Sequence, residues 1–192
     1  MTKASDARRD LIETTALQLF AERGYAEVSV RDIAQACGVG ESALYRHMRS
    51  KEELAIRVFR EAYLGFAQEM LSAALGATGL REKLTAYLAV MLEGFDRDPL
   101  RMRFLLIQQH DTLAKAITLE DETPLTVVRD AIAEAIDAGE IDATDPDMAT
   151  AQAMGAALQP MTFMLYGRIP APAISHHQTI LEGLTRLLGH NQ

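Results

Sequence analysis

The stretch from Ser29 to Leu54 reads SVRDIAQACGVGESALYRHMRSKEEL, and it predicts two very short helices followed by the start of a third. Ser29 is a favourable helix N-cap, and Asp32 is placed to return a hydrogen bond to the cap in a capping box. Apolar side chains then recur at helical spacing until Gly38, a residue type that commonly ends a helix. The first helix is therefore expected to begin at Val30 and to last about two turns.

A second short helix is predicted from Gly40 to Met48, with Leu44 and Met48 on its buried face. Ser50 is expected to cap the third helix, with Glu53 completing another capping box. Two short helices joined by a glycine-containing turn are typical of the helix-turn-helix unit, whose second helix can lie in the major groove of DNA. The alternative is a pair of solvated helical turns in an all-α core.

The predicted exposed face of this segment is basic. Between residues 40 and 51, Arg46, Arg49 and Lys51 outnumber the single acidic residue Glu41. Tyr45 and His47 add hydrogen-bond donors that can reach phosphates or base edges. This composition favours the nucleic-acid interpretation.

The net charge of −8 would argue against a DNA-binding protein if it were spread evenly over the 192 residues. Residues 1–60 carry ten Lys and Arg against nine Asp and Glu, whereas the remainder carries nine against eighteen. The acidity therefore lies in the second part of the chain, and the charge pattern predicts weak nonspecific binding to nucleic acid.

The single cysteine, Cys37, excludes an intrachain disulfide and indicates a reducing compartment. The first ten residues are polar, unlike a secretory signal, and no uncharged run approaches the ~18 residues that a membrane helix needs. We therefore expect a cytoplasmic protein.

The rest of the chain predicts an all-α fold with about nine helices. A long helix is expected from Lys51 to Leu75, and basic residues become rarer near Ile56. This change predicts a three-helix helix-turn-helix domain at residues 1–55 and a larger helical domain at residues 56–192.

Four segments resemble the DNA-binding domain of the TetR (tetracycline repressor) family, over roughly residues 8–56: Asp32-Ile33-Ala34, Cys37-Gly38-Val39, Ala43-Leu44-Tyr45-Arg46-His47-Met48 and Ser50-Lys51-Glu52-Glu53-Leu54. Two departures are Met48, where the family usually has Phe, and Glu41, where it often has Lys or a small polar residue. Beyond this span the resemblance extends only to the number and length of helices.

The resemblance implies a dimeric transcriptional regulator, most often a repressor, that binds a palindromic operator in double-stranded DNA and is released by a small, largely apolar effector. The residues expected to contact DNA are Ser29, Arg31, Ser42, Tyr45, Arg46, His47 and Lys51, with Ser42 and Arg46 at base edges. The residues expected to line an effector pocket are Met70, Met91, Phe95, Met102, Gln109, Met154, Met161 and Tyr166. The alternative for each of these pocket residues, taken singly, is an ordinary place in the hydrophobic core.

The resemblance also implies a homodimer formed through the last two helices. Small residues in the first of them and an apolar stripe in the second suit such an interface: Ala149, Ala151, Ala153, Gly155, Ala156, Ala157, Ile180, Leu181, Leu184, Leu187 and Leu188. The alternative is that these faces complete the core of the monomer.

No enzyme motif is found, so no catalytic residue, metal ligand or cofactor is expected. Two other functions stay open. One is an all-α ligand-binding protein or enzyme subunit with a vestigial helix-turn-helix, which the acidic Glu41 favours. The other is an activator or an adaptor for a protein partner.

Overall fold

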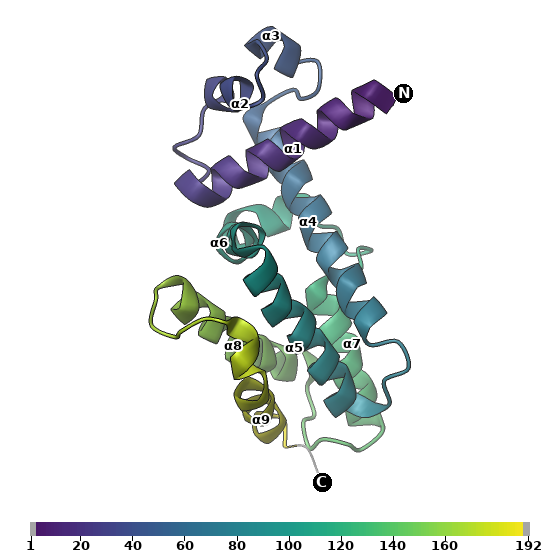
Figure 1. Cartoon of the computed structure of the whole chain (residues 1–192). Helices are drawn as coiled ribbons and strands as arrows, with labels where there is room; N and C mark the ends of the chain where they lie inside the picture. The colour runs from purple at the N-terminus through teal and green to yellow at the C-terminus, as the bar shows by residue number, and fades with distance from the viewer. Residues whose placement is uncertain (1–2, 190–192) are drawn as a thin grey trace. The chain divides into compact units, whose positions relative to one another are not determined.

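The computed structural model describes the backbone of residues 3–189 and the side chains of residues 6–107 and 115–189. In this described part the fold is all-α, as predicted. The α-helices, labelled in Figure 1, are α1 (Lys3–Arg23), α2 (Val30–Ala36), α3 (Glu41–Leu44), α4 (Lys51–Ala73), α5 (Gly79–Arg97), α6 (Pro99–Ala116), α7 (Pro124–Asp137), α8 (Pro146–Leu165) and α9 (His177–Leu187). A short 3₁₀ helix, η1 (Ala173–His176), directly precedes α9. None of the described helices is both long and apolar enough to cross a membrane.

The chain folds as two compact units. The N-terminal unit runs from the start of the chain to Ala62 and also includes Leu100–Leu119, which is most of α6. The C-terminal unit holds Tyr63–Pro99 and the chain from Glu120 onward. Helix α4 is continuous through Ala62 and Tyr63, so its first half belongs to one unit and its second half to the other. The boundary predicted between residues 55 and 56 stays a prediction.

Three phenylalanines from distant parts of the sequence meet in the core of the N-terminal unit. Phe20 of α1, Phe59 of α4 and Phe104 of α6 are each at most 2% exposed. The ring of Phe104 lies 6.3 Å from that of Phe20 and 6.1 Å from that of Phe59, between centroids. Aromatic pairs at this separation attract each other beyond their buried area. Phe104 therefore holds α6 in the same unit as the predicted helix-turn-helix.

The C-terminal unit packs α5, α7, α8 and α9 around side chains such as Leu92, Ile132 and Met161, which have no exposed area. Hydrogen bonds place the connection between α8 and α9 against α5. Both carboxylate oxygens of Asp96 accept backbone N–H groups at the start of η1, from Ala173 at 2.7 Å and Ile174 at 3.0 Å. This contact satisfies donors that a helix start leaves unpaired.

The second helix of the predicted pair is shorter than its sequence suggests. α3 has Gly40 as its N-cap and ends at Leu44, so the helix predicted to reach Met48 is wrong in its second half. Residues 45–47 continue as a tighter turn, in which the Arg46 N–H donates to Ala43 and the His47 N–H donates to Leu44, three residues back. Such tightening is common where a helix ends, and α4 begins only a few residues later, at Lys51.

Candidate functional site

The start of α2 has the predicted capping box. The backbone N–H of Asp32 donates to the Ser29 hydroxyl at 3.1 Å, and the backbone N–H of Ser29 donates to the Asp32 carboxylate at 2.8 Å. Hydrogen bonds from the Ser29 hydroxyl and then from its backbone lower the pKa of Asp32. The cap begins α2 at Val30, and Arg31 in the first turn is exposed.

The turn after α2 depends on one glycine. Gly38 has φ of +66°, in the left-handed region where a side chain is disfavoured. The Gly38 N–H donates to Gln35, and the N–H of Val39 donates to Ala34. This arrangement closes α2 and leads the chain into α3 within a few residues.

The orientation of α3 follows from two apolar anchors. Leu44 has no exposed area and Met48 is 3% exposed, so both lie in the core of the N-terminal unit. The opposite face is open to solvent: Tyr45 is 52% exposed, and Ser42 and Arg46 are exposed as well. α3 and the turn after it therefore present a phenol, a hydroxyl and a guanidinium on one surface of the free protein.

His47 and Glu41 complete the description of this surface. His47 is half-buried, and Glu41 stands exposed in the first turn of α3. A carboxylate there stabilises the helix N-terminus through the helix dipole, but it repels an approaching phosphate. Ser42, Tyr45 and Arg46, rather than Glu41, are the donors available to an anionic partner.

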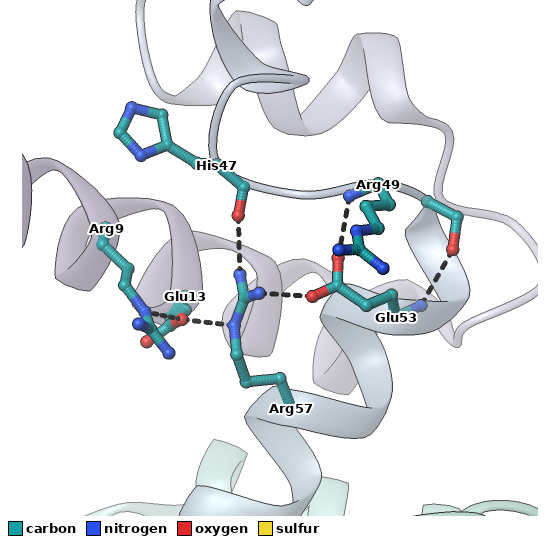
Figure 2. Close-up of polar contacts among 7 residues, drawn as sticks. Arg9, Glu13, His47, Arg49, Glu53 and Arg57 are labelled. Carbon is teal, nitrogen blue, oxygen red and sulfur yellow. Dashed lines mark hydrogen bonds and ion pairs between the residues drawn. The ribbon is translucent and has the colours of Figure 1, made fainter.

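Behind α3, a polar cluster joins α4 to α1 and to the turn (Figure 2). Arg57 of α4 donates from Nε to Glu13 of α1 at 2.6 Å, from Nη1 to Glu53 at 2.6 Å and from Nη2 to the carbonyl of His47 at 3.1 Å. Arg9 donates to the same Glu13 oxygen at 2.8 Å. Two pairs four residues apart, Arg9 with Glu13 in α1 and Glu53 with Arg57 in α4, signal parts of this cluster in the sequence. The bond from Arg57 to Glu13 has no such signal.

Glu53 takes a role different from the predicted one. The Ser50 hydroxyl does cap α4, because it accepts the Glu53 N–H at 3.0 Å. The Glu53 carboxylate, however, accepts the N–H of Arg49 at 2.8 Å rather than that of Ser50. The reciprocal half of the predicted capping box is thus shifted by one residue, since the same carboxylate must also reach Arg57.

The cluster also brings a second carboxyl group close to Glu13. Burial, followed by the negative charge of Glu13, raises the pKa of Glu61, which lies one turn after Arg57 on α4. Glu13 itself is only 8% exposed. The two guanidinium groups of Arg9 and Arg57 supply the positive charge that a buried carboxylate requires.

Lys51, predicted to contact phosphate, has internal partners in the free protein. Its ammonium group donates to the carbonyls of Tyr25 and Val28, at 2.8 Å each, and lies 4.2 Å from the centre of the Tyr25 ring. These contacts tie α4 to the segment between α1 and α2. The phosphate contact stays a prediction, and the geometry assigns Lys51 a structural role.

Replacing Lys51 by Met is expected to lower the free energy of unfolding by about 2 kcal/mol, because hydrogen bonds to a charged group are worth about that much. The measurement is urea denaturation followed by circular dichroism. Lys115→Met is the control, since the ion pair of Lys115 with Glu52 is well exposed and such pairs contribute less. Equal effects of the two substitutions would contradict the structural role of Lys51.

The predicted effector residues differ in burial and belong to both units. In the C-terminal unit, Met70, Met91 and Met161 are buried, Phe95 and Met154 are half-buried, and Tyr166 is 70% exposed. Met102 is buried in the N-terminal unit. Gln109 lies outside the residues whose side chains are described.

One hollow of about 430 Å³ lies on the surface of the C-terminal unit, and none of the predicted effector residues lines it. Its lining residues come from α4 and α5: Gly65, Gln68, Glu69, Ser72, Val90, Glu93 and Arg97. The buried methionines fill space in the core, as flexible thioether side chains commonly do. An effector pocket at the predicted residues stays a prediction.

The last two helices each leave one face exposed. On α8 that face holds residues at helical spacing: Met148, Ala151, Gln152, Gly155, Gln159, Phe163 and Tyr166 at the helix end. Three of them are large and well exposed, Met148 at 58%, Phe163 at 44% and Tyr166 at 70%. On α9, Gly183 and the 46%-exposed Leu187 lie on the exposed side.

Most of the residues predicted to form the dimer interface instead complete the core of their own unit. This group comprises Ala149, Ala153, Ala157, Ile180, Leu181, Leu184 and Leu188, each at most 8% exposed. Ala151, Gly155 and Leu187 are the predicted interface residues that stay exposed, and Ala156 is half-buried. The face available to a second chain is therefore different from, and more polar than, the predicted one.

Among the described residues, no group of three or more His, Cys, Asp or Glu side chains could hold a metal ion. Cys37, the only cysteine in the sequence, is the C-cap residue of α2 and is buried.

Comparison with known proteins places this site in a family context. Residues 12–58 match the model of the bacterial regulatory proteins of the tetR family. A TetR family transcription regulator from Marinobacter aquaeolei VT8 is 18% identical, with a TM-score of 0.81, and 100% of each chain is covered.

Two further similar structures were solved with ligands. FadR from Bacillus subtilis, in complex with stearoyl-CoA, is 22% identical, with a TM-score of 0.75 and with 91% of this chain and 96% of that chain covered. AibR, in complex with isovaleryl coenzyme A and operator DNA, is 21% identical, with a TM-score of 0.70 and with 96% and 100% covered. The TM-scores of these three structures show that they share the fold of this chain, and at identities of 18–22% the similarity establishes the fold alone.

Proposed function

We propose that the chain, whose residues 12–58 match the model of the tetR family of bacterial regulatory proteins, is a ligand-responsive transcriptional repressor of that family. A homodimer binds a palindromic operator, and a small apolar effector releases it. The protein acts in the bacterial cytoplasm, where the chromosome lies, and it catalyses no reaction.

The observation that carries this proposal is the orientation of α3. Leu44 of α3 and Met48, four residues later, are buried. Ser42 of α3 and Tyr45 and Arg46 of the turn that follows it are exposed. A helix held by its apolar face and open on its polar face can enter the major groove, where Arg reads guanine and hydroxyl groups read either base type. We propose that Ser42 and Arg46 contact base edges.

The remaining predicted residues are proposed to contact phosphates. Arg31 is exposed in the first turn of α2, and Tyr45 and His47 add donors beside α3. Ser29 contributes by capping α2, since its hydroxyl accepts the Asp32 N–H. Lys51 contributes to phosphate binding only if DNA replaces its contacts with Tyr25 and Val28.

Two α3 helices must lie about 34–36 Å apart to enter successive major grooves of one operator. The exposed faces of α8 and α9 support a two-fold dimer: Gly155 and Ala151 allow close approach of helices, and Phe163 and Met148 supply apolar area. Each subunit then contributes α8 and α9 to a four-helix interface.

Release by an effector is proposed to act through α4. This helix starts beside the DNA-reading segment at Lys51 and continues into the C-terminal unit as far as Ala73. An effector that binds one orientation of α4 more tightly than another shifts the population toward it and changes the spacing of the two α3 helices. Two similar structures hold isovaleryl coenzyme A and stearoyl-CoA. The first compounds to test are therefore acyl-CoA thioesters, which join an apolar acyl chain to a large charged carrier, together with the free acids of the same chains, which match a small apolar effector.

The test is to sequence genomic DNA retained by the purified protein. One recurring palindromic fragment, bound at nanomolar protein and released by an added effector, is the expected result. If no fragment is enriched over bulk DNA, the alternative is favoured, an all-α ligand-binding protein or enzyme subunit with a vestigial helix-turn-helix. The exposed Glu41 on α3 supports that alternative.

Replacing Arg46 by Ala is expected to weaken binding to the enriched fragment by roughly tenfold or more, because a bidentate contact to guanine is worth about 1–3 kcal/mol. Discrimination should fall at one base position in each half-site. The measurement is fluorescence anisotropy with a panel of singly substituted duplexes. Arg81→Ala, at an exposed position of α5, is the control, and an equal loss for both variants would remove Arg46 from the base contacts.

A further inference from the structure

We propose that Arg57 is a positioning residue for DNA recognition: its guanidinium group sets the orientation of α3 without contacting DNA. This inference rests on the proposed function. It concerns how the free protein holds the reading surface ready for DNA.

The guanidinium group of Arg57 is the junction of three segments that are far apart in the sequence (Figure 2). It is bonded to α1 through Glu13, to its own helix through Glu53, and to the backbone after α3 through the His47 carbonyl. Its side chain is 22% exposed and that of Glu13 is 10% exposed. A planar fork with several fixed donors can hold three acceptors in one geometry.

The junction holds both sides of the turn between α3 and α4. Arg57 itself binds the His47 carbonyl, and Glu53, oriented by Arg57, accepts the N–H of Arg49. These two backbone groups flank Met48, the buried anchor of this turn. The turn is therefore fixed on one side by apolar packing and on the other by charged hydrogen bonds.

These contacts of the turn are important because α3 is too short to hold its own direction. The helix consists of only Glu41–Leu44, and its N-cap, Gly40, makes no side-chain hydrogen bond. A helix this short has little intrinsic stability. Its direction therefore depends on the segments at its two ends, and base contacts tolerate only small errors in direction.

Lys51 provides the second attachment on the same helix. It holds the carbonyls of Tyr25 and Val28, just before α2 begins, while Arg57 holds the residues just after α3. The first two turns of α4 thus form hydrogen bonds to the segment before α2 and to the turn after α3. Arg57 is the attachment next to the reading surface.

The test uses Arg57→Lys, which keeps the positive charge beside Glu13 but replaces the fork by one ammonium group. That group cannot reproduce contacts in three directions. Arg103→Lys, at an exposed position of α6 in the same unit, is the matched control. The probes are the genomic fragment enriched by the wild-type protein and a scrambled duplex of equal length.

We expect Arg57→Lys to bind the enriched fragment about tenfold more weakly, as for the loss of one good base contact. Binding to the scrambled duplex, and the slope of log affinity against log salt concentration, should stay as in the wild type, because no phosphate contact is lost. Hydrogen exchange should accelerate at residues 41–50 and not in α5 or α7. A general loss of stability would not produce this pattern.

Wild-type affinity and specificity in a folded Arg57→Lys protein would overturn the proposal. So would a slope reduced by about 2, which indicates one lost phosphate contact in each subunit. If Arg57→Lys does not fold, Glu53→Gln takes its place in the test, because this substitution weakens the hydrogen bond to the Arg49 N–H and leaves Arg57 bound to Glu13. Weaker binding to the enriched fragment then supports the proposal, and wild-type affinity overturns it. Failure of the wild-type protein to enrich any DNA would instead reject the proposed function.

Discussion

Replacing Gly155 by Arg is expected to convert the dimer into monomers and to weaken operator binding by about 10²- to 10⁴-fold. A dimer binds its second half-site as an intramolecular event, and the loss of that advantage costs affinity of this order. Gly155 lies near the middle of the exposed face of α8. A long charged side chain there would separate two closely packed helices.

The substitution suits this purpose because the single chain has room for it. A Cβ atom built on Gly155 meets no atom within 4 Å, and the residue is not among the glycines with positive φ. Inside a helix, replacing Gly by another residue also removes an unfavourable loss of backbone entropy. The monomer should therefore fold at least as well as the wild-type chain.

Sedimentation velocity gives the oligomeric state, and a titration of the enriched fragment gives the affinity. Ala138→Arg, at an exposed position just after α7, is the control and should leave both unchanged. If Gly155→Arg stays dimeric with full affinity, the dimer does not form through this face of α8.

Replacing Phe104 by Ala is expected to destabilise the N-terminal unit by about 3–5 kcal/mol, the usual cost of removing a buried phenyl ring. Phe104 is 2% exposed and contacts the rings of both Phe20 and Phe59. Its removal leaves a cavity at the point where α1, α4 and α6 meet. The unfolding midpoint should fall by roughly 6 to 20 °C.

Thermal unfolding followed by circular dichroism measures the effect, and hydrogen exchange in α1 locates it. Ile107→Ala, on the same helix but 49% exposed, should shift the midpoint much less. If Phe104→Ala left exchange in α1 unchanged, α6 would not be part of the N-terminal core.

Local sequence signals predicted the ends of several helices. The capping box of Ser29 with Asp32 begins α2 at Val30 as predicted, and the Ser50 hydroxyl caps α4. These features are local, because a cap, a proline or a left-handed glycine acts on the backbone within a few residues. The exposure of Tyr45 and Arg46 was predicted in the same way, from the spacing of Leu44 and Met48.

The contacts of charged side chains were much less predictable. For Lys51, the resemblance implied a DNA contact, but nothing in the sequence indicated that its ammonium group donates to two carbonyls about 25 residues earlier in the chain. Glu53 was assigned to Ser50, but Arg57 and the Arg49 N–H hold it. A long flexible side chain can reach several partners, and the sequence alone does not rank them.

By itself, the sequence determined the all-α fold, the helix-turn-helix pair and its exposed polar face, since each follows from periodicity and capping over short distances. Tertiary structure alone decided that Phe104 packs into the N-terminal core, that Arg57 joins three segments and that most of the apolar residues of α8 and α9 are buried within their own unit. In each of these cases the partners are distant in sequence. An amphipathic helix specifies which of its faces is buried, but only the folded chain determines what covers that face.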